Sequence, residues 1–558
     1  MASAVGDLSR LLQKKTSTRI EAKGIVVAPQ PEAAAVGAEI LRAGGNAVDA
    51  ALATGFAQGI VDPLMGGIGG FGCLLIHSAD TQKTTAIGFH GRAGSQARPD
   101  IFSDQVIGQI HGHAERYEVK DAANQIGYRS VVVPGTPAGF GAAHKQFGRL
   151  PWKTILEPAI ALARDGVFLA GEVYDRWTEI CEPGHRTGIE RINATAACQK
   201  VFAPEGNMLL PGALLRQPDY ATTLEWLGRA GTDDFYRGDI GRTIAADFEK
   251  NGGLFTAKDL ATYEPDIGPP VIGRYRGLEI RSVPLPASGV QLVEMLNVLE
   301  HFDLASLRRA DRALYVHIVA RAMLASFSDR VCYLGDPRFV EVPIERLCSA
   351  EHAAELATKV CGDEPIEVSG LGYRESQHTT QVCVLDAEGN AVTLTHTLGS
   401  ASGVVTPGLG FVFNNCMYQY HPFPGHPNSI APGKSRMTGI TGTIILKEGR
   451  PWLATGALGG TRMPSAVLHT VLNIIDHGHS PVEAVEGARF HAESAWLEME
   501  SRLYFDLGKS LASLGWRLRP SPRGYDRAFG LAFAVLRDSE GTFHGGSDPR
   551  GGGGISVA

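Results

Sequence analysis

The stretch from Thr379 to Leu398 constrains the fold of this chain more than any other. It contains two apolar, β-branched runs, residues 379–385 and 391–398, joined by Asp-Ala-Glu-Gly-Asn. β-Branched residues favour extended backbone, and a short connection with Gly and Asn is typical of a hairpin. We therefore predict two antiparallel strands, the first of which begins with Thr379 and Thr380.

Thr379 has two interpretations at this point. It can be an ordinary strand residue, because a threonine hydroxyl is a weak nucleophile without a base. The chemistry changes if the chain is cut just before it. The new α-amine then lies on the same residue as the hydroxyl and can accept its proton.

The same stretch resembles the processing site of γ-glutamyltranspeptidases, in which a Thr-Thr pair precedes an apolar strand and an Asp-x-x-Gly-Asn-Ala-Val turn. The resemblance covers roughly residues 24 to 550. Further motifs that carry it are residues 44–51, 66–72, 133–139, 333–337, 414–415, 455–462 and 547–550. It implies an α+β fold, the four-layer αββα sandwich of N-terminal-nucleophile hydrolases, and self-cleavage between His378 and Thr379.

Length and composition are those of a large globular protein. The chain has 558 residues, of which 44% are hydrophobic and 20% charged, so it can bury a large core. No repeat and no linker-like run divides it. We therefore expect residues 23–378 and 379–558, the large and small subunits that cleavage would produce, to form one interlocked domain. Residues 1–22 are polar and are expected to be disordered.

Charge and hydropathy exclude several classes of partner. The net charge of -7 is modest and spread along the chain, which argues against nucleic acid. No apolar run is long enough for a membrane-spanning helix, and the first thirty or so residues lack the apolar core of a secretion signal. These features, and cysteines placed inside apolar runs, predict a cytoplasmic protein without membrane contact.

Helices and strands alternate along the chain. Helices are predicted for residues 31–42, 47–59, 152–165, 220–229, 240–251, 290–301, 311–328 and 463–478, and a strand for residues 24–28. The helix at 47–59 is apolar almost all round and is therefore expected to be buried. Strands at both ends of the sequence with helices between them fit a layered α/β or α+β core.

Residues 67–72 match G-x-G-x-x-G, the fingerprint of dinucleotide-binding proteins. That fingerprint needs a strand before it and a helix after it. Here a helix is predicted before it and a strand, residues 73–77, after it, so we predict a close-packed loop instead. No cofactor and no metal is expected, because the eight cysteines show no zinc-binding spacing.

Gly459 and Gly460 lie between a predicted strand and the helix that begins near Met463. Two successive N–H groups at a helix N-terminus can stabilise an oxyanion, although a simple turn would have the same sequence. The matching family motif favours an oxyanion hole. The resemblance also implies that the Thr397 hydroxyl orients the Thr379 nucleophile.

The substrate-binding positions depart from the family pattern. Where the transpeptidases have an arginine that binds the substrate α-carboxylate, this chain has His90, with Arg92 two residues later. Gln419 replaces the aspartate that holds the α-amine, and Thr438 with Gly439 replaces a pair of serines. Losing one partner of a buried ion pair costs about 2–5 kcal/mol. A γ-glutamyl group is therefore expected to bind poorly.

We predict a self-processing threonine amide hydrolase or acyltransferase with a modified acyl pocket and a small-molecule amide substrate. The short segment 420–436, in place of the family's lid, suggests an open cleft. The two fragments would remain associated as an αβ heterodimer, with an (αβ)2 assembly as a further option. Two alternatives stay open. One is a true γ-glutamyltransferase or glutathione hydrolase that uses Arg92, and the other is an uncleaved, inactive homologue that acts as a binding protein.

Overall fold

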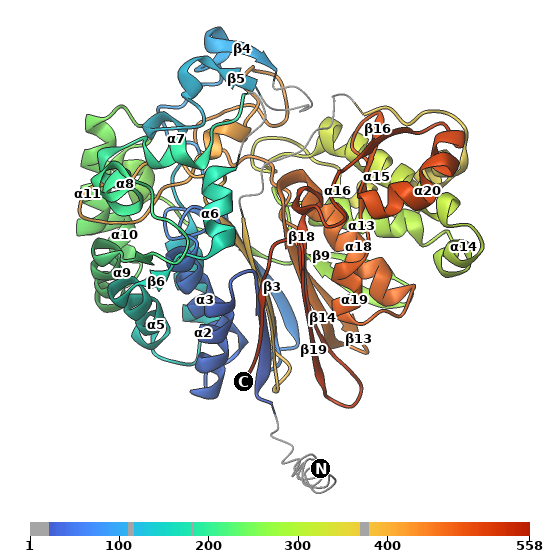
Figure 1. Cartoon of the computed structure of the whole chain (residues 1–558), viewed down its shortest axis with the longest axis horizontal. Coiled ribbons are helices and arrows are strands. Elements are labelled where there is room, and N and C mark those ends of the chain that lie inside the picture. The colour runs from blue at the N-terminus through green and yellow to red at the C-terminus, as the bar shows by residue number, and fades with distance from the viewer. Residues whose placement is uncertain (1–21, 110–116, 180–183, 369–378) are drawn as a thin grey trace, which may run out of the picture.

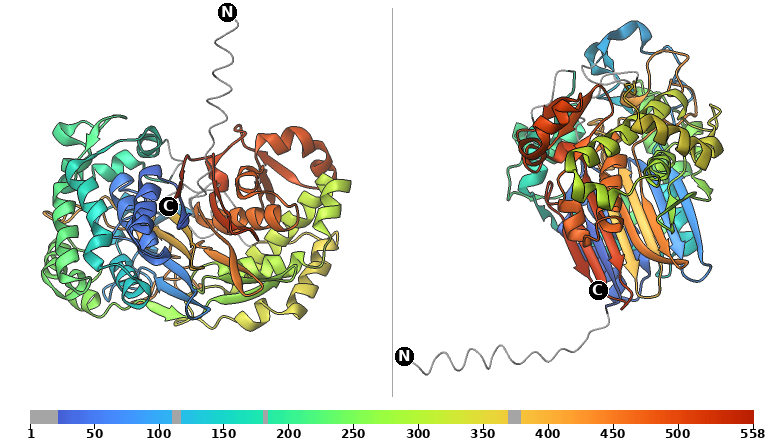
Figure 2. Two further views of the ribbon diagram at one scale, coloured as in Figure 1. Left: turned by 90° about the horizontal axis from the view of Figure 1, so that it is seen from below. Right: turned by 90° about the vertical axis from the view of Figure 1, so that its right-hand side faces the viewer.

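Two β-sheets lie face to face in this protein, and helices cover the outer face of each (Figure 1, Figure 2). The structure is a computed structural model that describes residues 22–109, 117–179, 184–368 and 379–558. The order of the layers is helix, sheet, sheet, helix, so the predicted four-layer αββα sandwich of the α+β class is confirmed. Residues 1–21 and His378 lie outside the described residues.

The strands of both sheets pair antiparallel throughout. The first sheet has the order β20 (Gly554–Val557), β1 (Gly24–Ala28), β11 (Thr380–Asp386), β12 (Ala391–Thr397), β2 (Phe71–Ser78), β3 (Lys83–Phe89) and β8 (Asp266–Gly268). The second has the order β19 (Phe543–Ser547), β18 (Leu531–Arg537), β14 (Arg450–Leu458), β13 (Thr443–Lys447), β10 (Leu278–Ser282) and β9 (Val271–Tyr275).

Both sheets combine strands from before and after Thr379. In the first sheet, β11 lies between β1 from the N-terminal part and its hairpin partner β12, which in turn pairs with β2. In the second sheet, β13 pairs with β10, which lies far upstream. Neither segment of the chain forms a complete sheet alone, so the two predicted subunits are interlocked through main-chain hydrogen bonds.

Each outer layer contains several helices (Figure 1). The layer on the first sheet includes α2 (Pro31–Arg42), α3 (Ala47–Val61), α4 (Thr136–Phe147), α5 (Trp152–Asp165), α9 (Pro218–Ala230) and α11 (Asp239–Lys250). The layer on the second sheet includes α13 (Gly289–Leu299), α15 (Arg312–Tyr333), α17 (Ala350–Cys361), α18 (Met463–Ile475), α19 (Pro481–Glu486) and α20 (Ser501–Ser513). None of the described helices is long and apolar enough to cross a bilayer.

Most predicted elements are confirmed with boundaries that differ by a few residues. β1, α2 and α5 have the predicted bounds, and α3 is buried at every position, as its uniform hydrophobicity predicted. The largest difference is α15, which continues to Tyr333. The glycine-rich loop lies after α3 and before β2, the reverse of the order in a dinucleotide site.

The first sheet is buried on both faces, and this explains its continuous apolar runs. Along β1, Ile25 and Val27 pack into the core that includes the second sheet, whereas Val26 and Ala28 pack against the layer of α2 and α3. Successive side chains of a strand point to opposite faces. A strand covered on both sides therefore has apolar residues at nearly every position, as β11 also does.

The N-terminus of α3 is fixed by a capping box and by the hairpin turn. The Asn46 side chain accepts the N–H groups of Val48 and Asp49 at 3.0 Å, and the Asp49 carboxylate accepts the Asn46 N–H at 3.1 Å. The Ala47 N–H donates to Asp386 at the end of β11, at 3.0 Å. The motif at residues 44–51 thus joins a helix to the hairpin that starts with the threonine pair.

A buried ionic network anchors the second sheet. Arg550 bonds Glu500 at 2.7 Å and Asp548 at 3.0 Å, and the side chains of all three are fully buried. Asp548 also accepts the N–H of Ala532 on β18 at 2.9 Å. Because Leu531 of β18 pairs with Leu458 of β14, the network helps to position the end of β14.

We predict that Arg550→Met destabilises the protein. The change leaves Glu500 and Asp548 with Arg502 and Arg489 as their remaining partners, and breaking a buried ion pair costs about 3–5 kcal/mol. A thermal melt should show a clear drop in Tm. Arg523→Met, at an exposed position of the loop that precedes β18, serves as the control and should melt like the wild type. Equal melting of both variants would contradict a stabilising role for this network.

Candidate active site

Thr379 lies immediately before β11, at one edge of the first sheet. Its hydroxyl is 3.3 Å from the Thr397 hydroxyl at the end of β12, and both residues are buried. The Gly399 N–H donates to the Thr397 Oγ1 at 2.9 Å and so helps to orient this hydroxyl. The structure therefore brings together the predicted nucleophile and the threonine predicted to orient it.

A buried polar network lies beside this pair. The Thr380 hydroxyl donates to Gln30 at 3.3 Å, and Gln30 donates in turn to Asp62 at 3.0 Å. The Gln58 amide donates to Gln30 at 2.9 Å and lies 2.9 Å from the His396 ring. Burial lowers the pKa of His396 to about 3, so this ring is neutral. The hydroxyl of Thr380 is thus bonded to this network and not to the Thr379 hydroxyl.

Gly459 and Gly460 lie at the end of β14, between this strand and the 3-10 turn that leads into α18. Their φ angles are 130° and 59°, in the left-handed region where a side chain would be strained. Leu458, the preceding residue, lines the same cleft as Thr379. The predicted oxyanion-hole glycines therefore lie on the second sheet, close to the nucleophile on the first.

Thr438 and Gly439 lie against this glycine turn. A Cβ placed on Gly439 would be 1.8 Å from the carbonyl oxygen of Gly460, so glycine is required by close contact. The Thr438 hydroxyl donates to the carbonyl of Pro286 at 3.3 Å. The segment is near the site, but Gly439 has no hydroxyl and that of Thr438 already has a protein acceptor.

His90 lies at the same edge of the first sheet as Thr379. Strand register places Thr380, His396, Gly72 and Phe89 in one row, and His90 directly follows Phe89. At about 4.8 Å per strand, this is roughly 14 Å from β11. Burial lowers the pKa of His90 to about 4, so the ring is neutral at pH 7. It therefore does not replace the charge of the family's arginine.

Arg92 is engaged elsewhere. Its guanidinium forms an ion pair with Asp266 at 3.0 Å and lies 4.9 Å from the ring centre of Tyr263. A cation with a carboxylate partner of its own must release it before it can bind a substrate carboxylate. The arrangement does not favour Arg92 as a substitute for the family's arginine.

Gln419 ends a short 3-10 turn and is half-buried, and its carbonyl accepts the Asn428 amide at 2.8 Å. Asn428 belongs to the short segment 420–436, which folds back on itself. The Tyr420 hydroxyl there bonds the carbonyl of Lys434 at 2.5 Å. None of the described residues lining the cleft at Thr379 comes from this segment. The segment therefore does not contribute to the described lining of this cleft.

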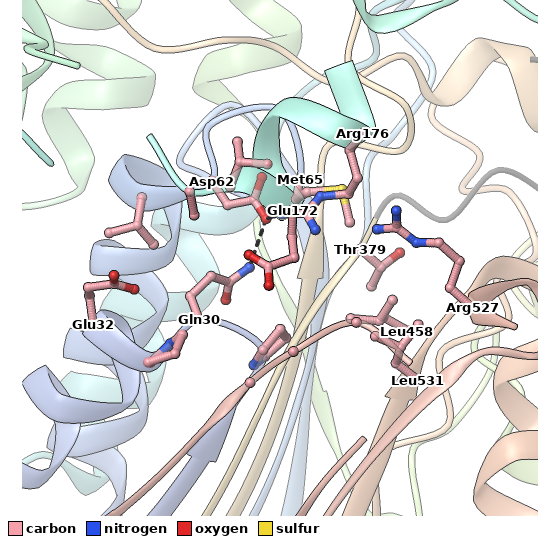
Figure 3. Close-up of a pocket in the computed structure, with 18 of the residues that line it drawn as sticks. Gln30, Glu32, Asp62, Met65, Glu172, Arg176, Thr379, Leu458, Arg527 and Leu531 are labelled. Atoms are coloured by element: carbon pink, nitrogen blue, oxygen red, sulfur yellow. Dashed lines mark hydrogen bonds and ion pairs between the residues drawn. The ribbon is translucent and has the colours of Figure 1, made fainter. Parts of the chain in front are cut away.

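The cleft beside Thr379 encloses about 700 Å³, including the space at its open mouth (Figure 3). Its polar lining combines Asp62 and Gln30 with Glu172 and Arg176 of α6 (Gly171–Thr178) and with Arg527 of the loop before β18. Arg176 forms an ion pair with Asp62. None of the five predicted substrate-binding residues is among the described residues that line it.

Sequence reasoning missed the two arginines of this cleft and also Arg436. The Arg436 guanidinium lies 5.1 Å from the ring centre of Phe71, the strand partner of Thr397, and donates to the carbonyl of Met437 at 2.9 Å. No motif marks these arginines, because each is an isolated charge in a loop or short helix. Strands β11 and β18 are far apart in sequence but lie close together in space, and this closeness makes Arg527 a neighbour of Thr379.

Comparison with known proteins places the chain in a family. A sequence profile of γ-glutamyltranspeptidase matches residues 33–558. The chain belongs to the γ-glutamyltranspeptidase family. The Acylase ACY 1 proenzyme of Pseudomonas sp. (strain V22) is 35% identical over 540 residues, covering 96% of this chain and 93% of the relative. The glutathione hydrolase proenzyme of Escherichia coli (strain K12) is 34% identical over 556 residues, covering 95% and 90%.

A solved structure agrees with this assignment. The cephalosporin acylase from Bacillus halodurans matches with a TM-score of 0.85 and 27% sequence identity, and the match covers 96% of each chain. The relatives thus include both acylases and glutathione hydrolases. Family membership establishes that the chain is an amidohydrolase or acyltransferase. It does not identify the substrate, which depends on the side chains of the site.

A second cluster of titratable groups lies between α13, α15 and α17, away from the cleft. Glu294, Asp329 and His352 each offer a ligand atom, and these atoms lie within 4.8 Å of one another. Their donor types suit a divalent cation. However, the His352 Nε2 already lies 2.7 Å from Asp329 and 3.3 Å from Glu294. Direct bonds between the three groups account for the arrangement as a structural cluster.

This cluster predicts a loss of stability as the pH rises toward about 8. Burial raises the pKa of Glu294 to about 8, and the hydrogen bonds that His352 donates to Glu294 and Asp329 raise the pKa of His352. A group whose pKa is raised on folding stabilises the protein below its ordinary pKa and loses this effect as the pH rises through the folded value. The wild-type Tm should therefore fall as the pH rises from about 4.5, the ordinary pKa of a glutamate, to about 8, the pKa of Glu294 in the folded protein.

Glu294→Gln, which keeps the neutral form at every pH, should flatten this fall. Glu351→Gln, at an exposed position on α17, is the matched control and should retain the wild-type pH dependence. Melting curves of the three proteins across the pH series provide the measurement. If Glu294→Gln falls as steeply as the wild type, the carboxyl does not titrate in this range.

Proposed function

We propose that this chain is a self-cleaving amide hydrolase or acyltransferase with Thr379 as its nucleophile and an acyl pocket unlike that of a γ-glutamyl-specific enzyme. The observation that carries the proposal is the 3.3 Å contact between the Thr379 and Thr397 hydroxyls. This pair of hydroxyls lies at the edge of the first sheet. Thr379 lines the cleft together with Leu458 of the second sheet, which directly precedes the glycine turn. A nucleophile with a partner hydroxyl and facing N–H donors is the arrangement that acyl transfer needs.

Maturation follows from the same residue. The Thr379 Oγ attacks the carbonyl carbon of His378, and the peptide nitrogen leaves as the new α-amine, so that an ester joins the two residues. Water then hydrolyses the ester, giving a carboxyl group on His378 and a free hydroxyl on Thr379. The two products remain together because both sheets contain strands from each. The relatives named proenzymes support this sequence of events.

Turnover would use the new α-amine as the base. Its ordinary pKa is about 7.7–8.0, which suits proton transfer near neutral pH. The amine takes the proton of the Thr379 hydroxyl as Oγ attacks the substrate amide carbon, and it returns a proton to the leaving amine. The N–H groups of Gly459 and Gly460 stabilise the negative oxygen. Water, or an acceptor amine, then releases the acyl group from Oγ.

The acyl group is proposed to lack an amino-acid head. His90 is neutral where the family has an arginine, and Arg92 is paired with Asp266. Gln419 carries no charge to hold an ammonium group. The likeness to acylases supports this proposal. The likeness to the glutathione hydrolase of Escherichia coli favours a second candidate, hydrolysis of γ-glutamyl amides, and a comparison of γ-glutamyl- with simple acyl-p-nitroanilides separates the two.

We predict that Thr379→Ala remains a single chain, whereas the wild type yields fragments of 378 and 180 residues. The hydroxyl is the attacking group, so alanine leaves no nucleophile for cleavage. A denaturing gel shows the two bands, and N-terminal sequencing of the small fragment should begin at Thr379. Thr379→Ser, which keeps a hydroxyl, should still cleave. A cleaved Thr379→Ala protein, or a different first residue, would defeat the assignment.

We predict that Thr397→Val lowers kcat by about 10- to 100-fold, because losing a buried hydrogen-bond partner costs about 1–3 kcal/mol. Valine has nearly the same shape, so packing should be preserved. Thr397→Ser keeps the hydroxyl and should retain most of the activity. The rate of chain cleavage and kcat on a simple acyl-p-nitroanilide are measured together. Equal rates for the two variants would exclude the orienting role of this hydroxyl.

A further inference from the structure

A second cavity lies in the outer helical layer of the second sheet. It encloses about 450 Å³, including the space at its open mouth. Its walls come from α14 (Leu304–Ala310), α15, α18 and α20, which lie on the same side of the molecule (Figure 1), and from the residues that lead into β15 (Phe490–His491). None of its described lining residues also lines the cleft of Thr379. We call it the α18 pocket, after the helix that contributes His469 and Asn473.

Arg308 of α14 lines the α18 pocket and has only neutral partners. Its Nη1 donates to the Asn473 Oδ1 at 3.3 Å, and its Cζ lies 5.8 Å from the ring centre of Tyr315. The Asn473 amide nitrogen donates to the carbonyl of Ala484 at 3.0 Å, and this bond fixes the amide oxygen toward Arg308. A half-buried guanidinium ordinarily has an anionic partner, because an unpaired charge is costly to bury.

The carboxylates closest to Arg308 already have other partners. Asp506 of α20 pairs with Arg312, the second charged residue of the lining. Asp476, at the end of α18, pairs with Arg276 at 3.0 Å. Among the described residues that line the α18 pocket there is no carboxylate. The positive charge of Arg308 is therefore not neutralised by the parts of the chain that the structure describes.

The positive charge of Arg308 acts on two histidines at the end of α18. Burial is the main cause that lowers the pKa of His477 to about 4, and Arg308 is the second cause. The same two causes, in the same order, lower the pKa of His479. Glu483 opposes them at His479, but its carboxylate caps α19 by accepting the Ser480 N–H at 2.8 Å. Both rings are neutral at pH 7, and Arg308 remains the cation of this region.

His469 provides an uncharged polar wall. Its Nε2 donates to the carbonyl of Phe490 at 2.8 Å, so this nitrogen carries the proton. Burial lowers the pKa of His469 to about 3, so the ring is neutral and its Nδ1 is an acceptor. His469 and Asn473 are four residues apart and lie on one face of α18. The polar part of the pocket thus combines the Arg308 cation with neutral groups.

Apolar side chains form the opposite kind of surface in the same pocket. Val316 of α15 and Leu503 and Leu507 of α20 line it, and all three are buried. A hydrocarbon group suits this surface, because its burial is favourable and needs no hydrogen bonds. A carboxylate suits Arg308, because a guanidinium can donate to both of its oxygens. The lining therefore fits an anion with an aliphatic tail better than a bare inorganic anion.

We infer that the α18 pocket is a binding site for a small aliphatic carboxylate, which pairs with Arg308 and lays its tail against Leu503 and Leu507. The site is separate from the reacting groups. α18 begins at Met463, next to the glycine turn, and Asn473 lies ten residues later, about 15 Å along the helix axis. Binding in this pocket needs no chain cleavage and no turnover, so the inference does not depend on the proposed function of Thr379.

The test titrates 4-methylpentanoate into the wild-type protein and follows the ligand by NMR. The Kd should be on the order of 1 mM, a typical value for so small a ligand. 4-Methylpentanamide has the same shape without the charge and should bind about 10- to 100-fold more weakly, the usual effect of losing a charge-assisted bond. Inorganic phosphate, which has the charge without the tail, should also bind more weakly than 4-methylpentanoate.

Variants locate the binding. Arg308→Gln should remove the preference for the acid over the amide, and Arg308→Lys should keep part of it. Arg309→Gln is the matched control, because Arg309 is the exposed neighbour on α14, bonds Ser306 at 3.0 Å and is not among the described lining residues. It should bind like the wild type. Ala488→Leu adds bulk to the lining but leaves Arg308 in place, and it should weaken binding of 4-methylpentanoate by at least about tenfold.

Thermal melts establish that each variant is folded, and the Thr379→Ala protein should bind 4-methylpentanoate like the wild type. The inference is overturned if the wild type binds the amide or phosphate as tightly as the acid. It is also overturned if folded Arg308→Gln binds like the wild type. Should Arg308→Gln fail to fold, Ala488→Leu decides, and unchanged binding by the folded protein rejects the pocket. None of these results bears on hydrolysis at Thr379.

Discussion

The position of Thr379 depends on the strand that follows it. β11 is hydrogen-bonded on one edge to β1 and on the other to β12, and both of its faces are buried. Cys383 packs into the core between the sheets, whereas Val382 and Val384 pack into the core under α3. A slip by one residue would exchange these two sets of side chains. A strand held in this way gives Thr379, the residue directly before it, a fixed place, whether or not a peptide bond precedes this residue.

The second sheet provides the other half of the site by the same means. β14 ends at Leu458, and the left-handed turn at Gly459 and Gly460 directs the chain into α18. Leu458 pairs with Leu531 of β18, whose start is anchored by the buried Asp548 and Arg550. Reacting groups must be held to a fraction of an ångström. Thr379 and Leu458 lie beside one cleft, each held by one of two sheets that pack face to face. Packed strands hold side chains more precisely than loops would.

The charged groups around Thr379 are organised differently from these rigid parts. The neutral His90 lies in the sheet, and Arg92 is committed to Asp266. The cations of the cleft, Arg176 and Arg527, come from a short helix and from a loop. Loops tolerate substitution better than buried strands, because few neighbours must adjust. The proposed catalytic groups and the charges of the cleft can therefore change independently, which agrees with relatives that include acylases and glutathione hydrolases.

The amino-acid sequence alone was sufficient to predict several helices and strands and to propose Thr379 as the nucleophile. Local signals were sufficient for α2, for the buried α3 and for the hairpin that follows Thr379, because periodicity, capping and turn chemistry act over a few residues. The tertiary structure decided which charges are available. Arg92 meets Asp266 across 174 residues of sequence, and Arg527 reaches the cleft of Thr379 only because the two sheets pack together. The state of a charged side chain depends on its burial and on its neighbours in space, and neither is encoded in any short stretch of the sequence.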